Sequence, residues 1–417
     1  DFLIQDIDWV AAEYGLSRWN DPLYWHMYKY SPAVPAIPEL AFNLANMIKA
    51  VFGKNKKALV LDLDNTLWGG VVGDDGPEGI AIGHETGMAQ VYSEFQMYLK
   101  AHKKMGVLLN IDSKNQEENA LAGLKRPDSI LSPEDFIVIK ANWQPKDQNL
   151  REIASELNIG QDALVFVDDN PAERHMVEHQ VPLAAVPEMT EGQEPQPERY
   201  IQILDRSGFF EPVRLSKDDL KRDAMYRENL LRKKQEAAFA DYGQYLRSLD
   251  MKAEIGSYSP EYMARIAQLT NKSNQFNLTT KRFTQAELEQ CAADQDYLDL
   301  YGRLTDRFGD NGVVSVILGR KEERILHIEL WLMSCRVLKR DMEKAMLDEL
   351  VIRSKRMGTS VIRGYYIPTA KNQMVKDFYG TMGFRLTEER EDKSTVWELE
   401  TETYRPCCSV IEIRQMK

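Results

Sequence analysis

The chain has 417 residues, of which 43% are hydrophobic and 28% charged, and its formal net charge is −12. This length predicts two or three domains, and the composition is typical of a soluble globular protein. No apolar run approaches the roughly 20 residues that span a bilayer, which argues against a membrane protein. The acidic surplus disfavours non-specific nucleic-acid binding, which depends on clustered Lys and Arg.

Cysteine usage points to a reducing compartment. The four cysteines form neither a disulfide framework nor a metal-ligand spacing, so we expect reduced thiols in the cytoplasm. The chain begins at an aspartate instead of a methionine, which predicts excision from a longer protein.

The first half of the chain predicts a helical N-terminal segment over residues 1–54 and an α/β domain over 55–205. Short apolar runs alternate there with amphipathic helices, an order typical of a doubly wound domain with a parallel sheet. The expected strands are 58–63, 107–111, 136–139 and 163–167, and the expected helices are 88–104, 117–124 and 146–157.

The second half predicts a helical connector over residues 206–248, which is strongly charged, and a second α/β domain over 249–417. The expected strands are 312–319, 324–332, 359–366 and 395–400, and the expected helices are 260–270, 284–292, 341–356 and 371–382.

Two carboxylates follow the first buried strand. Asp62 and Asp64 are two residues apart, so period-2 alternation points both side chains the same way. Ligands of open α/β sheets bind beyond the carboxyl ends of the strands, and Mg²⁺ prefers hard oxygen ligands. We therefore predict a Mg²⁺ site where Asp62 attacks phosphorus and Asp64 transfers protons. The alternative is a pair of Asp residues that only caps a turn.

Polar residues after the later strands favour the catalytic interpretation. A hydroxyl, backbone N–H groups and a lysine at strand ends can hold a phosphoryl group, and two further acids can complete a metal shell. The predicted phosphate-binding residues are Ser113, Lys114, Asn115 and Lys146. The predicted metal ligands are Asp62, Asp64, Asp168 and Asp169.

This order of motifs resembles the haloacid dehalogenase-like (HAD) phosphatase superfamily. The stretches 62–70, 113–115, 142–143, 168–174 and 271–280 further resemble the FkbH-like family, and the resemblance covers nearly the whole chain. It implies an enzyme of polyketide biosynthesis that takes a glyceryl unit from 1,3-bisphosphoglycerate. Such an enzyme removes the phosphate, holds the unit as a thioester and passes it to an acyl carrier protein.

Position 112 departs from the family pattern. The resemblance implies a cysteine before the motif serine as the thioester site, and this chain has Asp112, which cannot form a thioester. We therefore expect Asp112 among the catalytic residues. We also expect a protein with aspartate at this position to be impaired in acyl transfer. Three explanations stay open: a deliberate substitution, natural loss of the acyl-transfer step, or another acyl-carrying thiol such as Cys335.

The last domain resembles the GCN5-related N-acetyltransferase (GNAT) fold. Its strand-to-helix loop over 336–341 has Lys339 and Asp341 where the family typically has small residues, so use of acetyl-CoA is not expected. A basic loop suits an acidic carrier protein with a phosphopantetheine arm instead. The candidate carrier-binding residues are Asn274, Gln275, Asn277, Arg336, Lys339 and Arg340.

Three functions remain distinct at this stage. The first is an FkbH-like glyceryl transferase and phosphatase that acts on 1,3-bisphosphoglycerate or a related phosphorylated three-carbon acid. Its expected partner is an acyl carrier protein, and we expect it to bind neither nucleic acid nor membrane. The second is a stand-alone small-molecule phosphatase with a partner-recognition domain. The third is a docking module with a decayed site, which the complete acidic set disfavours.

Overall fold

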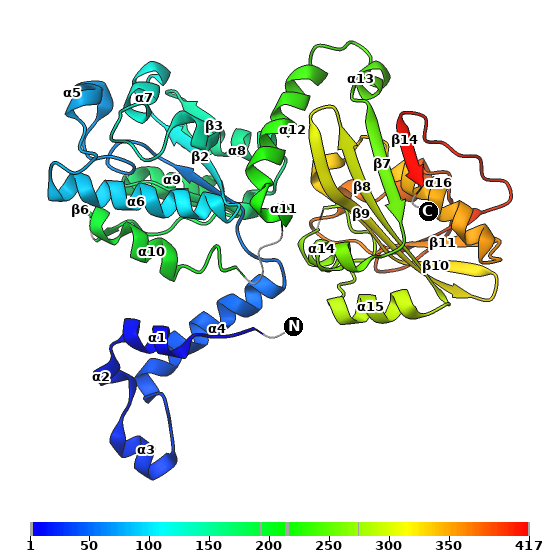
Figure 1. The fold of residues 1–417 in the computed structure, drawn as a ribbon, viewed down its shortest axis with the longest axis horizontal. Helices are drawn as coiled ribbons and strands as arrows, with labels where there is room; N and C mark the ends of the chain where they lie inside the picture. The colour runs from blue at the N-terminus through cyan, green and yellow to red at the C-terminus, as the bar shows by residue number, and fades with distance from the viewer. Residues whose placement is uncertain (1–2, 192–193, 213–216, 274, 416–417) are drawn as a thin grey trace. The chain divides into compact units, whose positions relative to one another are not determined.

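The computed structural model describes residues 3–191, 194–212, 217–273 and 275–415. The chain divides into two compact units, Asp1–Ser155 with Gly160–Leu215 and Glu156–Ile159 with Ser216–Lys417 (Figure 1). Across the described ranges, we find no helix with the length and apolar character needed to cross a bilayer.

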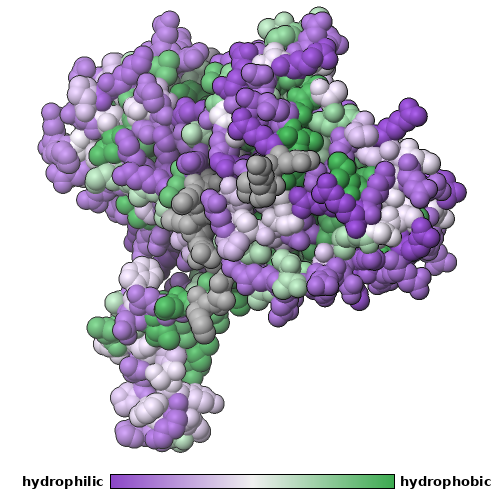
Figure 2. Space-filling view, turned by 45° about the vertical axis from the view of Figure 1, so that its right-hand side comes forward, coloured by the Kyte–Doolittle hydropathy of each residue, from purple (hydrophilic) through white to green (hydrophobic). Residues whose placement is uncertain are grey.

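The N-terminal segment is helical, as predicted, and its helices are α1 (Ile7–Tyr14), α2 (Leu16–Trp19), α3 (Pro22–Tyr28) and α4 (Ile37–Val51). Asp6 and Asp21 cap α1 and α3 by accepting hydrogen bonds from backbone N–H groups of the first turn. Many large apolar side chains of this segment are exposed, including Ile4, Leu16 and Leu23, and Figure 2 shows apolar and polar residues mixed on its surface.

The first unit contains the expected parallel sheet, which confirms its fold class. Its strands are β1 (Ala58–Leu61), β2 (Leu108–Ser113), β3 (Phe136–Ala141) and β4 (Leu164–Val167), in the order β3-β2-β1-β4. The helices are α5 (Val72–Gly79), α6 (Gly87–Lys104), α7 (Glu117–Leu124), α8 (Lys146–Leu157), α9 (Pro171–Gln180) and α10 (Tyr200–Arg206). Every residue of β1 and β4 is buried, as the unbroken apolar runs predict.

Strand register explains how distant acids come together. Leu61 pairs with Ile111 on one side and with Val167 on the other. The next residue of each strand is an aspartate, so Asp62 lies between Asp112 and Asp168 at the carboxyl edge of the sheet. A small hairpin, β5 (Thr190–Glu191) with β6 (Glu194–Pro195), follows further along the chain.

The second unit contains an eight-stranded mixed sheet in the order β12-β13-β11-β10-β9-β8-β7-β14. The strands are β7 (Met251–Gly256), β8 (Tyr297–Asp306), β9 (Gly309–Glu322), β10 (Ile325–Met333), β11 (Val361–Tyr366), β12 (Arg385–Glu389), β13 (Thr395–Glu400) and β14 (Ile411–Gln415). The helices are α11 (Lys217–Leu220), α12 (Arg222–Glu236), α13 (Tyr242–Ser248), α14 (Pro260–Lys272), α15 (Gln285–Ala293), α16 (Met342–Arg356) and α17 (Phe378–Thr381).

The stretch predicted as a helical connector contains α11, α12 and α13. One prediction for this half of the chain needs correction. The helix expected over 371–382 is a 3₁₀ turn (Gln373–Val375) followed by the single turn α17. Gly380 lies within α17 and Gly383 follows it with φ +84°, and glycine weakens a helix or ends it.

Candidate functional site

Three carboxylates converge at the carboxyl edge of the first sheet. One oxygen from each of Asp62, Asp168 and Asp169 lies within 4.8 Å of the others. The backbone fixes Asp62 there, because its N–H donates to Val167 O at 2.9 Å and so extends the pairing of β1 with β4. Asp168 and Asp169 directly follow β4.

Lys146 neutralises part of this charge. It opens α8, its side chain is buried, and its Nζ lies 2.8 Å from Asp62 Oδ1 and also donates to Asp168 Oδ2. Burial alone would lower the pKa of Lys146, but the two carboxylates raise that pKa above its ordinary value. Lys146 is therefore a fixed positive charge within the acidic cluster.

The single ammonium group of Lys146 does not balance the three carboxylates, so the cluster keeps a surplus of negative charge. Burial first, and then the neighbouring carboxylates, raise the pKa of Asp168 to about 6 and that of Asp169 to about 7. Three oxygen donors this close together are the hard ligands that a small divalent cation prefers. The donor set thus fits a divalent cation bound by Asp62, Asp168 and Asp169.

The side chain of Asp64 lies outside this cluster of three, and its predicted role as a metal ligand stays a prediction. Its Oδ1 accepts hydrogen bonds from Trp68 Nε1 and Val72 N, both at 2.9 Å, and its Oδ2 accepts one from Asn115 Nδ2 at 2.7 Å. Burial is the largest influence on its pKa, which is raised. Asp64 is therefore a positioned carboxyl group that can carry a proton.

Asp112 is fully buried beside the acidic cluster. Its Oδ1 accepts a hydrogen bond from Asn149 Nδ2 at 2.9 Å, and its Oδ2 has no hydrogen-bond partner. Burial raises the pKa of Asp112 to about 8, although Asn149 and Lys146 oppose the shift. A pKa of about 8 favours the protonated form of this carboxyl group at neutral pH.

Of the predicted phosphate-binding residues, the structure brings Lys146 and Asn115 to the acids and directs Lys114 elsewhere. Ser113 is buried at the end of β2, where its carbonyl accepts hydrogen bonds from Asn115 N at 3.0 Å and Asn142 N at 3.1 Å. Lys114 is exposed and forms an ion pair with Glu173 at 2.5 Å.

Several supporting residues escaped the sequence analysis. Buried Arg174 donates from Nη1 to Asp168 O and Asp169 O, both at 2.9 Å, and so fixes the acidic turn. Thr66 Oγ1 accepts from Asp169 N at 3.2 Å. Asn149 lies one helical turn after Lys146, and this i,i+3 spacing is the signal that could have identified it.

Two of the predicted carrier-binding residues, Arg340 and Asn277, are buried. Arg340 is buried, and its guanidinium contacts Asp306 Oδ2 at 3.3 Å and Asn229 Oδ1 at 3.0 Å. Burial lowers the pKa of Arg340 to about 10. Arg232 is buried as well and forms an ion pair with Asp306 Oδ1 at 2.7 Å. Arg340 therefore belongs to an internal ion-pair network, which corrects its assignment as an accessible residue.

The remaining candidates of the second unit are divided between internal and exposed positions. Arg336 is half-buried and contacts Met225 Sδ and Ser334 Oγ, whereas Lys339 is exposed. Asn277 is buried, and its Oδ1 accepts from Thr280 N at 2.9 Å. Gln275 is half-buried, and Asn274 lies outside the described residues.

Because the pKa of Asp112 is raised in the folded protein, the free energy of unfolding should depend on pH. The unfolded aspartate has a pKa of 3.8, so the stability that protonation provides is complete below that pH and is lost as the pH rises towards about 8. Urea unfolding in EDTA at pH 5 and pH 8 should therefore show a smaller decline for Asp112→Asn than for wild type. The free energies of unfolding of wild type and Asp112→Asn should diverge by on the order of 1.4 kcal/mol for each pH unit. Parallel declines would contradict a buried, protonated Asp112.

Sheet order and the carboxylate cluster define an α/β protein with an acidic, cation-compatible site in its first unit. No family model and no curated protein matches the chain. One solved structure, the N-terminal part of a Bacteroides fragilis protein that contains a phosphatase domain complexed with Mg, is 39% identical with a TM-score of 0.47. That match covers 49% of this chain and 54% of the other, so this chain spans about half the length of its relative.

Other solved structures are similar to the second half of the chain at low identity. The ribosomal-protein-S18-alanine N-acetyltransferase of Escherichia coli is 11% identical with a TM-score of 0.28, covering 36% of this chain and 94% of that one. Ard1 of Thermoplasma volcanium is 18% identical with a TM-score of 0.28, covering 36% and 97%.

Proposed function

We propose that the first unit is a Mg²⁺-dependent phosphatase in which Asp62 is the nucleophile. The observation that carries this proposal is the cluster of Asp62, Asp168 and Asp169 around Lys146 at the carboxyl edge of a parallel sheet. The 39% identity to a phosphatase domain that is itself complexed with Mg supports the choice of cation. When bound, Mg²⁺ would neutralise phosphoryl charge, a role that hard-oxygen ligands favour.

Residues of this chain can supply each bond change and each proton transfer of phosphate hydrolysis. An oxygen of Asp62 forms a bond to phosphorus while the bond from phosphorus to the leaving oxygen breaks, and Asp64 gives that oxygen its proton. Asp64 then takes a proton from water, whose oxygen attacks phosphorus and releases Asp62. The raised pKa of Asp64 favours this donor role. Lys146 orients Asp62 and counters phosphate charge.

The finer proposal concerns the substrate. The FkbH-like motifs favour 1,3-bisphosphoglycerate or a related phosphorylated three-carbon acid, in the context of polyketide biosynthesis. The four cysteines are Cys291, Cys335, Cys407 and Cys408, and none lies in the first unit. A thioester beside Asp62 would therefore need a thiol from elsewhere, and we propose phosphate release without an acyl-enzyme at position 112.

Glyceryl transfer to an acyl carrier protein is the second candidate, favoured by the combination of stretches 62–70 and 271–280. The two are separated by measuring phosphate release from 1,3-bisphosphoglycerate with and without a phosphopantetheinylated carrier, against the spontaneous hydrolysis of a no-enzyme sample. Mass spectrometry of the carrier measures transfer. Release without carrier acylation supports the phosphatase, acylation supports transfer, and background rates in all samples would refute both.

A further inference from the structure

Two exposed histidines lie one turn apart on α9 of the first unit, the helix labelled α9 in Figure 1. His175 and His179 are four residues apart, so both side chains lie on one face of the helix. Their ring centroids are 4.1 Å apart. A pair of histidines with this helical spacing can bind one metal ion, provided that a nitrogen of each ring is available.

One hydrogen bond fixes the orientation of the His179 ring. Its Nδ1 lies 2.8 Å from His175 O. Because a carbonyl oxygen only accepts, Nδ1 carries the proton, and Nε2 of the neutral ring keeps its lone pair. Histidines that bind metals usually donate their other ring N–H to a backbone carbonyl or a carboxylate in this way. His179 is therefore oriented as a ligand that binds through Nε2.

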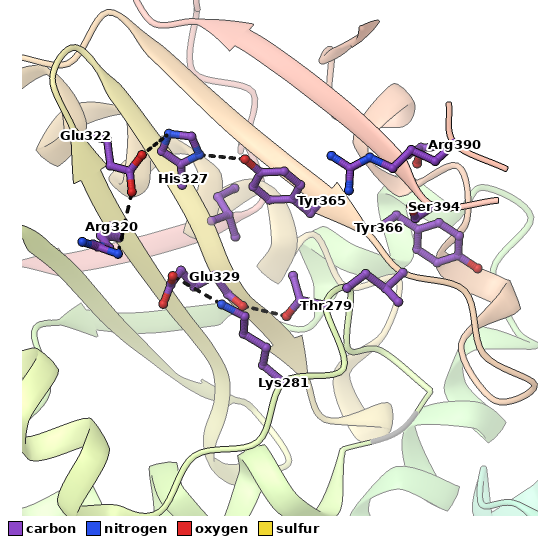
Figure 3. A pocket seen from close by; sticks show the side chains of 13 residues that line it. Thr279, Lys281, Arg320, Glu322, His327, Glu329, Tyr365, Tyr366, Arg390 and Ser394 are labelled. Carbon is purple, nitrogen blue, oxygen red and sulfur yellow. Dashed lines mark hydrogen bonds and ion pairs between the residues drawn. The ribbon is translucent and has the colours of Figure 1, made fainter. Parts of the chain in front are cut away.

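The remaining ring nitrogens of the pair are open to a ligand. Across the described parts of the chain, the ring nitrogens of His175 and Nε2 of His179 form no hydrogen bond or ion pair. His327, in a cavity of the second unit, shows the opposite case (Figure 3). Its Nδ1 lies 2.7 Å from the Tyr365 hydroxyl and its Nε2 lies 3.7 Å from Glu322, so both of its nitrogens are engaged.

The charges beside the pair suit a cation. Glu178 is exposed and lies three residues after His175, so its carboxylate is on the neighbouring surface of the same helix. Arg174, the residue before His175, is buried and forms an ion pair with Glu188. The positive charge closest to the pair along the chain is therefore already offset by a carboxylate.

We propose that His175 and His179 together bind a divalent transition metal, of the kind that imidazole prefers, with water as the other ligands. Because both rings are exposed, a small rotation brings Nε2 of His179 and one nitrogen of His175 to the same ion. Imidazole nitrogens favour Ni²⁺, Cu²⁺ and Zn²⁺, whereas Mg²⁺ prefers hard oxygen ligands. The site is separate from the acidic cluster and does not depend on the phosphatase proposal.

The test is a calorimetric titration of the full chain with Ni²⁺, in excess Mg²⁺ that occupies the acidic cluster. Wild type should show saturable binding. His175→Gln and His179→Gln should each weaken that binding by about tenfold or more, because the second ligand of a chelate binds at high effective concentration. The double variant should resemble the single variants, since either change alone removes the chelate. Any binding left in the double variant measures Ni²⁺ at other sites.

The matched control is His84→Gln, which removes an exposed histidine from the loop before α6 and should leave Ni²⁺ binding unchanged. Thermal unfolding without metal verifies that each variant is folded. Ni²⁺ should also raise the Tm of wild type more than that of the double variant, because the ion binds the folded pair. Absence of saturable binding, wild-type affinity in folded His179→Gln, or an equal loss in His84→Gln would overturn the proposal.

Discussion

Replacing Asp62 with asparagine should lower phosphate release by about a thousandfold or more, since the attacking carboxylate is lost while the fold is kept. Asparagine has nearly the same shape and can still accept a hydrogen bond from Lys146, which lies 2.8 Å from Asp62 Oδ1. It also removes one negative charge from three crowded acids. Initial rates of phosphate release measure the effect, with thermal unfolding as the test of folding.

The matched control for this variant is Asp8→Asn, an equivalent change at an exposed position in the first turn of α1. Its turnover should equal that of wild type. A folded Asp62→Asn protein with wild-type turnover would show that another group attacks phosphorus or that the site is not catalytic.

Replacing Lys146 with methionine should destabilise the protein by about 3–5 kcal/mol in EDTA, the usual cost of removing one partner from a buried ion pair. Lys146 is 3% exposed and contacts both Asp62 and Asp168. Without its ammonium, the three carboxylates lose the side-chain cation that contacts Asp62 and Asp168. Mg²⁺ should therefore restore part of the lost stability, measured as the free energy of unfolding in urea with and without the cation.

The comparison for Lys146→Met is Lys140→Met on β3, whose partner Glu152, 2.8 Å away, has a side chain that is 60% exposed, whereas the Lys140 side chain is 19% exposed. An ion pair with a solvent-exposed partner contributes about 0–1 kcal/mol, so this variant should stay much closer to wild type than Lys146→Met, with or without Mg²⁺. Equal losses in the two variants, or a Lys146→Met protein that does not respond to Mg²⁺, would argue against a cation site at the acidic cluster.

The first unit could be predicted from sequence because β1 and β4 are continuous apolar runs and the acidic residues follow directly at their carboxyl ends. Register then makes Asp62 and Asp168 neighbours, although more than a hundred residues separate them. The direction of Asp64 was not predictable, because it depends on the Trp68 indole and the backbone at Val72, which fold back onto it. The alternation of side chains along a strand indicates which face of the sheet Asp64 lies on, but it does not identify the hydrogen-bond partners of Asp64.

The second unit was less predictable because its strands are less regular. β8 includes Asp299, Arg303 and Asp306, and β12 is exposed throughout, so neither is a plain apolar run. The position of Arg340 was misjudged for a related reason. A basic residue in a loop usually faces solvent, but Asp306 on β8 lies close enough to hold it inside.

The most direct test of the account is a crystal structure of the protein with Mg²⁺ and beryllium fluoride, which mimics a phosphorylated aspartate. Beryllium fluoride should lie on an oxygen of Asp62, with Mg²⁺ bound among Asp62, Asp168 and Asp169. An empty carboxyl edge, or a fluoride adduct on a different residue, would contradict it.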